Sequence, residues 1–147
     1  MNIPQIHLTI QDNVHKKKLL PKKKVLAWLN YFIKKTSSIT VRIVMPAESE
    51  QLNSDFRKIN APTNVLSFLI ENKPLVGDII LCHEIIKQEA LEQKKRLEDH
   101  YAHLIIHGCL HLLGYDHELN TDAVKMEAME IKILKKIGIP NPYLVKN

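Results

Sequence analysis

The sequence has 147 residues, of which 45% are hydrophobic and 25% charged, close to the average of soluble folded proteins. This composition excludes a disordered or fibrous protein, and the length suits one globular domain, residues 1–147, with a core that needs no disulfides. The net charge of +5 is uneven, because residues 1–73 carry 12 basic against 5 acidic residues and residues 74–147 carry 9 against 11.

The N-terminal part predicts a strand, a basic segment and a helix. Residues 5–10 alternate apolar and polar side chains, the period of a half-buried strand. Residues 15–24 contain six lysines, and residues 25–33 repeat apolar side chains with helical spacing. The lysines favour a polyanionic partner such as RNA, although a solvated basic surface explains the same residues.

The rest of the chain predicts more strands and then long helices. Strand patterns rich in β-branched residues cover 39–45, 64–70 and 78–82, with a polar helix expected over 47–59. Helical periodicity then covers 83–97, 99–113 and 121–137. We therefore expect an α+β fold, with one mixed sheet of about four strands and about five helices on one face.

The cysteines and apolar segments indicate a cytoplasmic protein with no membrane partner. Cys82 and Cys109 are far apart and in no CxxC arrangement, so we expect two buried, reduced thiols. The first ten residues lack the charged and apolar regions of a signal peptide. No apolar stretch approaches the roughly 18 residues of a membrane span.

Three histidines have chelating spacing, since His107, His111 and His117 follow H-x3-H-x5-H. Residues four apart on a helix differ by about 40° in direction, so the first two can direct their imidazoles at one ion. Gly114 can adopt the left-handed conformation that ends a helix, which lets His117 approach from outside it. Three imidazoles leave a fourth position for water, as in catalytic zinc sites. We expect one Zn²⁺ per chain at the end of a central helix, although other divalent metals bind imidazoles too.

The same spacing matches the zinc-protease signature H-E-x-x-H-x-x-G-x-x-H and predicts zincin-like motif geometry, except that Gly108 replaces the glutamate. That glutamate moves a proton from zinc-bound water to the leaving amine, so its absence disfavours peptide hydrolysis. A phosphodiester needs less proton transfer and benefits from a cation beside the metal. His103, one turn earlier, is a supporting, substrate-contacting or incidental residue, and Asp116 orients a ligand or caps the turn.

These residues and several further segments resemble the YbeY endoribonuclease family of rRNA maturation factors. The family pattern H-G-x-L-H-L-x-G-Y-D-H is present in full at residues 107–117. Further family blocks are N-x-x-[YF]-R at 53–57, P-T-N-V-L-S-F at 62–68, G-D-I at 77–79, and M-E-x-x-E with Met126, Glu127 and Glu130. The resemblance covers about residues 50–143. The sequence departs from the family pattern at residues 58–61 and at His83, and these differences affect the expected local contacts with RNA.

The resemblance also assigns site residues. It places the zinc ligands on His107, His111 and His117, and an essential arginine on Arg57. The planar guanidinium suits a phosphate, so we expect Arg57 to stabilise charge on the scissile phosphate as a catalytic residue. The further candidates for substrate binding are Thr63, Asn64, Ser67 and His103, of which the first two are also typical turn residues.

The resemblance implies a zinc-dependent, single-strand-specific endoribonuclease in 16S rRNA 3′-end maturation and ribosome quality control. Its implied partners are rRNA, ribosomal small-subunit components and an assembly GTPase. The nucleophile is either metal-bound water or the 2′-hydroxyl of the RNA. With only 5% aromatic residues we expect no extended base-stacking platform, and therefore salt-dependent RNA binding. The rival functions are a non-enzymatic assembly factor with structural zinc and a zinc peptidase with a displaced base.

Overall fold

The computed structural model describes residues 5–115 and 119–144, and these ranges contain one mixed four-stranded sheet and five helices. The strands are β1 (Ile6–Asp12), β2 (Ser37–Val44), β3 (Val65–Glu71) and β4 (Leu75–Cys82). The helices are α1 (Lys22–Asn30), α2 (Pro46–Arg57), α3 (His83–Glu92), α4 (Leu97–Leu112) and α5 (Asn120–Lys136). The expected α+β class and its numbers of strands and helices are confirmed.

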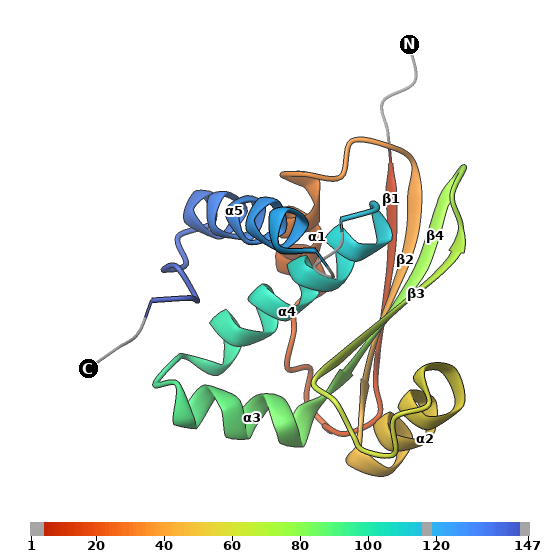
Figure 1. Ribbon diagram of the computed structural model, residues 1–147. Coiled ribbons are helices and arrows are strands. Elements are labelled where there is room, and N and C mark those ends of the chain that lie inside the picture. Colours follow the sequence, from red (N-terminus) through yellow and green to blue (C-terminus); the bar gives the residue numbers. More distant parts are fainter. Residues whose placement is uncertain (1–4, 116–118, 145–147) are drawn as a thin grey trace.

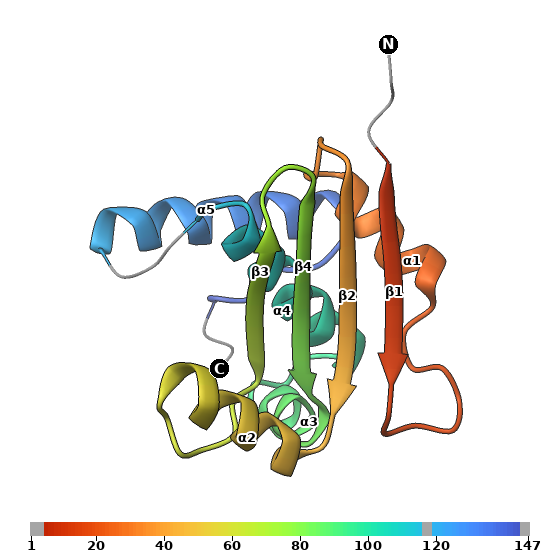
Figure 2. The same ribbon diagram turned by 90° about the vertical axis from the view of Figure 1, so that its right-hand side faces the viewer.

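The sheet has the strand order β1-β2-β4-β3 (Figure 2). Strands β1, β2 and β4 are parallel, whereas β3 pairs with β4 in antiparallel orientation. Among the described strands, β3 therefore has a neighbour on one side only. Its other edge leaves backbone N–H and C=O groups outside the sheet ladder.

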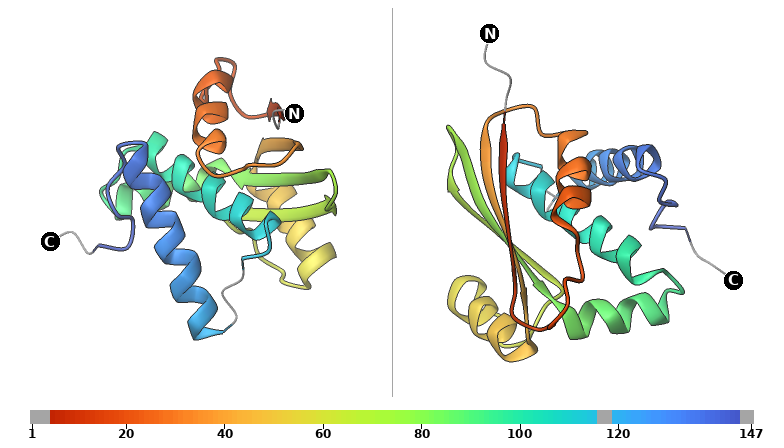
Figure 3. Two further views of the ribbon diagram at one scale, coloured as in Figure 1. Left: turned by 90° about the horizontal axis from the view of Figure 1, so that it is seen from above. Right: turned by 180° about the vertical axis from the view of Figure 1, so that it is seen from behind.

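The helices lie on both faces of the sheet. Helices α1, α4 and α5 lie on one side of the sheet, and α2 lies on the other (Figure 1). Figure 3 shows α5 against α4, which is the helix that contacts β3, β4, α1 and α3 as well. The expectation that all helices cover one face is therefore wrong for α2, whose apolar side covers a small cluster of Val44, Leu66 and Ile80. Nothing in the polar sequence of α2 indicated which face it would cover.

Helix α4 is central because most of its surface is buried against these neighbours. Gly108 of α4 packs closely against β3 and β4. An added Cβ would lie 2.8 Å from the Ser67 hydroxyl oxygen, closer than real contacts allow, and 3.0 Å from Cδ1 of Ile79, which is tighter than most contacts. The absence of a side chain at Gly108 therefore sets how closely the neighbouring histidines approach β3.

Helix α4 ends as its sequence predicts. Gly114 has a φ of 101°, and its N–H donates to the carbonyl oxygen of His111 at 3.0 Å. The N–H of Tyr115 donates to the carbonyl oxygen of Leu110 at 3.0 Å, which satisfies carbonyl groups at the end of the helix. The predicted third ligand His117 and its neighbour Asp116 lie outside the described residues.

The structure also bears out the prediction on the cysteines and contains the helices needed to examine the one on membrane spans. Cys82 and Cys109 are both buried free thiols, as expected. Burial raises the pKa of the Cys109 thiol to about 12, which makes it a poor nucleophile near neutral pH. Within residues 5–115 and 119–144, every helix is too short or too polar to cross a lipid bilayer.

Candidate metal centre

His107 and His111 direct the same ring nitrogen at one point beside α4. Their Nε2 atoms are 3.2 Å apart, and their rings are nearly perpendicular, with an interplanar angle of 81°. Two imidazoles bound to one tetrahedral zinc at the usual bond length place their nitrogens about 3.3 Å apart. The separation of these two nitrogens therefore fits a shared metal ion.

The second nitrogen of each ring is held by an oxygen acceptor. Nδ1 of His107 donates to a carboxylate oxygen of Glu130 at 2.5 Å, and Nδ1 of His111 donates to the backbone carbonyl of Tyr115 at 3.1 Å. A proton on Nδ1 leaves the lone pair on Nε2, which is the tautomer that binds a metal. The donor chemistry thus agrees with the spacing of the Nε2 atoms.

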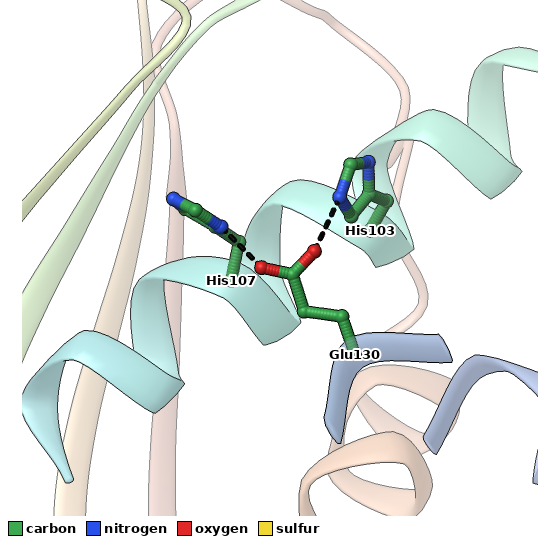
Figure 4. A group of neighbouring side chains, drawn as sticks. All are labelled: His103, His107 and Glu130. Carbon is green, nitrogen blue, oxygen red and sulfur yellow. Dashed lines mark hydrogen bonds and ion pairs between the residues drawn. The ribbon is translucent and has the colours of Figure 1, made fainter. Parts of the chain in front are cut away.

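Glu130 is a buried carboxylate from α5 that connects several side chains of the site (Figure 4). Its other oxygen accepts from Nε2 of His103 at 2.8 Å and from the hydroxyl of Tyr143. Burial alone would raise the pKa of Glu130, but the hydrogen bonds from His103, His107 and Tyr143 outweigh it and lower the pKa to about 2. Glu130 is therefore an ionised anchor for His107.

A second trio could also hold a metal, since ligand atoms of His103, His107 and Glu130 all lie within 4.8 Å of one another. However, the separations of 2.5 and 2.8 Å from Glu130 are those of charge-assisted hydrogen bonds. An ion between these atoms would replace the protons that now satisfy the buried carboxylate. The distances therefore favour metal binding by His107 and His111, with Glu130 and His103 behind them.

His107 and His111 line a groove of about 740 Å³ together with most of the predicted substrate-binding residues. We call it the β3 groove, because β3 and the segment before it supply much of its wall. The predicted site residues that line it are Arg57, Thr63, Asn64, Ser67, His107 and His111. The fold therefore brings the end of α2 and the part of α4 that carries His107 and His111 to one groove.

The polar residues of the β3 groove differ in their contacts. Ser67 donates its hydroxyl to the carbonyl of Gly108 at 3.1 Å, and the amide of Asn64 donates to Glu89 at 3.1 Å. The backbone of Thr63 exchanges hydrogen bonds with the Ser49 hydroxyl at 2.9 and 3.0 Å. These contacts fix the shape of the wall, whereas the exposed Arg57 supplies a cation to the groove.

His103 lies apart from the groove-lining residues. It is 8% exposed and is bonded to Glu130, and burial lowers its pKa. This position favours a supporting role behind His107. Contact between His103 and RNA stays a prediction.

The family model described as Endoribonuclease YbeY matches residues 7–138 of this chain. Two curated proteins named Endoribonuclease YbeY match as well. The protein from Colwellia psychrerythraea is 48% identical over 139 residues, covering 86% of this chain and 90% of its own length. The protein from Burkholderia lata is 43% identical over 149 residues, covering 95% and 87%. This chain belongs to the YbeY family.

A solved structure has a fold similar to that of this chain. The solution structure of TM1509 from Thermotoga maritima has a TM-score of 0.55 and 25% sequence identity, covering 90% of this chain and 91% of that one. The family model and the two curated relatives confirm the resemblance to the YbeY family that the sequence motifs indicate.

Sequence reasoning gave no role to Glu130, although it recognised the residue as part of a YbeY block. A signal was present, because Met126, Glu130, Ile133 and Leu134 share the buried face of α5. A carboxylate on an apolar helix face needs a partner. Its partner His107 is 23 residues away in the chain, so local patterns could not reveal it.

Proposed function

We propose that this YbeY-family chain is a zinc-dependent endoribonuclease that cleaves single-stranded RNA. The main observation in support is the pair of Nε2 atoms of His107 and His111, 3.2 Å apart and facing the groove that Arg57 also lines. The relatives' name, Endoribonuclease YbeY, supports RNA as the substrate.

The metal would be held by His107 and His111, with His117 as the third ligand predicted from the sequence. A divalent ion bound there supplies Lewis-acid chemistry, lowering the pKa of bound water and drawing charge from a phosphate oxygen. Zinc is favoured by three imidazole ligands, although nickel and copper bind the same donors.

The chain's own residues prepare the substrate and the ligands. Arg57 offers a planar set of donors to the phosphate and to the charge that develops on it. Glu130 keeps the proton of His107 on Nδ1 and resists rotation of the ring through its further bonds to His103 and Tyr143. Arg57 is therefore the catalytic residue of this proposal, and Glu130 is a positioning residue.

The identity of the nucleophile can be determined from the products. Attack by the 2′-hydroxyl of RNA leaves a 2′,3′-cyclic phosphate and spares DNA. Attack by water gives a linear phosphate end and can cleave a deoxy substrate. Analysis of the product ends, with matched RNA and DNA strands, separates the two routes.

The wider role follows from the family resemblance. We propose that the RNA is rRNA, that the reaction belongs to 16S rRNA 3′-end maturation and ribosome quality control, and that the protein acts in the cytoplasm. Small-subunit components and an assembly GTPase are the proposed partners. The basic N-terminal half, with a net charge of +7 over residues 1–73 (12 basic minus 5 acidic), suits such polyanionic surroundings.

The direct test compares Arg57→Gln with Lys58→Gln, which removes one positive charge at the adjacent exposed position. We expect Arg57→Gln to lower kcat about 100-fold or more, the usual cost of losing one donor to transition-state charge, with folding and metal content unchanged. Lys58→Gln should retain activity. Equal activity of both variants would contradict the role of Arg57, and RNA binding without cleavage by any metal-loaded protein would favour the assembly factor.

A further inference from the structure

One exposed aromatic side chain in the β3 groove has no role in the proposed chemistry. Phe56, at the end of α2, is 65% exposed, although it is among the largest apolar side chains of the protein. It lines the same groove as Arg57, His107 and His111. A side chain with this much exposed surface contributes little to the hydrophobic core. Core packing therefore does not explain an aromatic ring beside the proposed metal centre.

The ring of Phe56 is supported from one side by Phe68 of β3. The two ring centroids are 5.1 Å apart with an interplanar angle of 61°, an edge-to-face arrangement of favourable energy. Phe68 is itself anchored, because it packs against the cluster of Val44, Leu66 and Ile80. The exposed ring is therefore positioned by a partner that belongs to the sheet.

The neighbourhood of Phe56 matches the parts of a nucleotide. The next residue, Arg57, lines the same groove, so an aromatic ring and a cation border one cavity. Bases stack on aromatic rings irrespective of their sequence, while phosphates bind guanidinium groups. An apolar protein segment would gain from the ring but not from the polar wall of Arg57, Thr63 and Asn64.

We propose that Phe56, held by Phe68, stacks on one unpaired base of the RNA strand beside the scissile phosphate. This inference rests on the proposed function, since it assigns a base-binding subsite to the same groove. It explains selection of single strands, because a base inside a duplex has no free face for the ring. It also refines the expectation from the low aromatic content, because the subsite holds one base instead of an extended row.

The test measures binding separately from cleavage. The probe is a short single-stranded 2′-O-methyl phosphorothioate RNA, resistant to hydrolysis, and the readout is fluorescence anisotropy with metal-loaded protein. Phe56→Ala should weaken binding by about 5- to 150-fold, the usual contribution of one stacked base. Phe56→Trp should bind at least as well as the wild type. Phe56→Leu keeps an apolar side chain without a flat ring and should bind nearly as weakly as Phe56→Ala.

An abasic unit provides the matched control in the ligand. At the position that contacts Phe56, removing the base should weaken binding to the wild type and leave binding to Phe56→Ala almost unchanged. Equal binding by wild type and Phe56→Ala, or full binding by Phe56→Leu, would overturn the stacking proposal and point to a protein-docking surface or a plain apolar contact.

The outcome is independent of the proposed catalytic activity. If no metal-loaded protein cleaves RNA but Phe56→Ala loses binding, the stacking inference stands and the nuclease proposal fails. If RNA is cleaved and Phe56→Ala has the KM and kcat of the wild type, the nuclease proposal stands and the stacking inference fails.

Discussion

At the scale of single residues, the proposed metal centre depends on the side chains that hold its histidines in place. Glu130 holds His107 through a 2.5 Å hydrogen bond and is itself held by His103 and Tyr143. We expect Glu130→Gln to weaken zinc affinity by about 10- to 100-fold, as for other residues that orient metal-binding histidines. Competition with a chelating dye measures this change. Glu127→Gln, an exposed position on the same helix, is the control and should bind zinc normally.

A row of hydrogen-bonding side chains that do not line the β3 groove contributes to the stability of the fold. Asp12 accepts from Nδ1 of His15 at 2.8 Å, the Nε2 atoms of His15 and His83 are 3.2 Å apart, and Nδ1 of His83 lies 2.7 Å from the Tyr101 hydroxyl. With both imidazoles neutral, every contact can pair one donor with one acceptor if the Tyr101 hydroxyl donates to His83 and His83 donates to His15. Protonation of His83 would disturb this order.

Burial, followed by the charge of His15, lowers the pKa of His83 from its ordinary value of 6.5. The unfolded chain therefore takes up this proton at a higher pH than the folded chain. The stabilisation is fully present above pH 6.5 and is lost as the pH falls toward the lowered pKa. Guanidinium unfolding at about pH 7.5 and about pH 5.5 should show this loss in the wild type and a smaller loss in His83→Gln. Identical pH dependence of the two proteins would contradict the assignment.

At the scale of elements, the contact between α4 and the sheet decides which chemistry the motif can carry. The position that holds a glutamate in zinc proteases is Gly108, which faces Ser67 and Ile79 with no room for a side chain. Gly108→Glu would place a charge between helix and sheet. We expect it to destabilise the fold by about 3 kcal/mol or more. Thermal unfolding measures this, with Gly108→Ala as the smaller substitution, and a stable Gly108→Glu protein that hydrolyses peptides would contradict the account.

The elements that sequence predicts best are those with local patterns. His107, His111 and Gly114 were recognised because a helical turn and its glycine end occupy consecutive residues. Boundaries were less accurate. The helix expected over 25–33 is α1 (Lys22–Asn30), since lysines fill its exposed first turn, and β4 starts at Leu75 instead of residue 78 because the β3–β4 turn is short.

The relations that sequence could not predict join distant segments. The face of the sheet covered by α2, the pairing of Glu130 with His107 and the contact of Phe56 with Phe68 all depend on tertiary packing. The strand order, which depends on pairing between distant segments, places β3 at an edge of the sheet. The groove that Arg57, His107 and His111 line lies beside this strand. The motif therefore predicts a metal site, while the tertiary packing assembles the candidate substrate groove.

At the scale of the whole molecule, the lysine-rich segment at residues 15–24 follows β1, at the opposite edge of the sheet from the β3 groove. The six lysines between β1 and the first turn of α1 are all exposed, and β1 and β3 are the opposite edges of the sheet. A short RNA bound in the β3 groove should not reach these lysines, whereas a long single strand can. The affinity for long RNA should therefore fall more steeply with salt concentration than the affinity for short RNA.

The prediction is specific to that basic segment. Replacing Lys16, Lys17 and Lys18 by glutamine should reduce the salt slope for long single-stranded RNA by up to about 2, since each lost phosphate contact removes about 0.7. The same change at Lys132, Lys135 and Lys136, which are exposed on α5, should have less effect. Binding isotherms at several salt concentrations measure both slopes. Equal slopes for the wild type and the protein with Lys16, Lys17 and Lys18 replaced would show that these three lysines form a solvated surface.

The most direct test of the central proposal is cleavage of a labelled single-stranded RNA by protein of known metal content, with His111→Ala, checked for folding, as the comparison. We predict that the wild type cleaves when loaded with zinc, stops when a chelator removes the metal and recovers when zinc returns, whereas His111→Ala stays inactive throughout. Equal, chelator-insensitive cleavage by both proteins, or no cleavage by the zinc-loaded wild type, would contradict a metal-dependent nuclease built on these histidines.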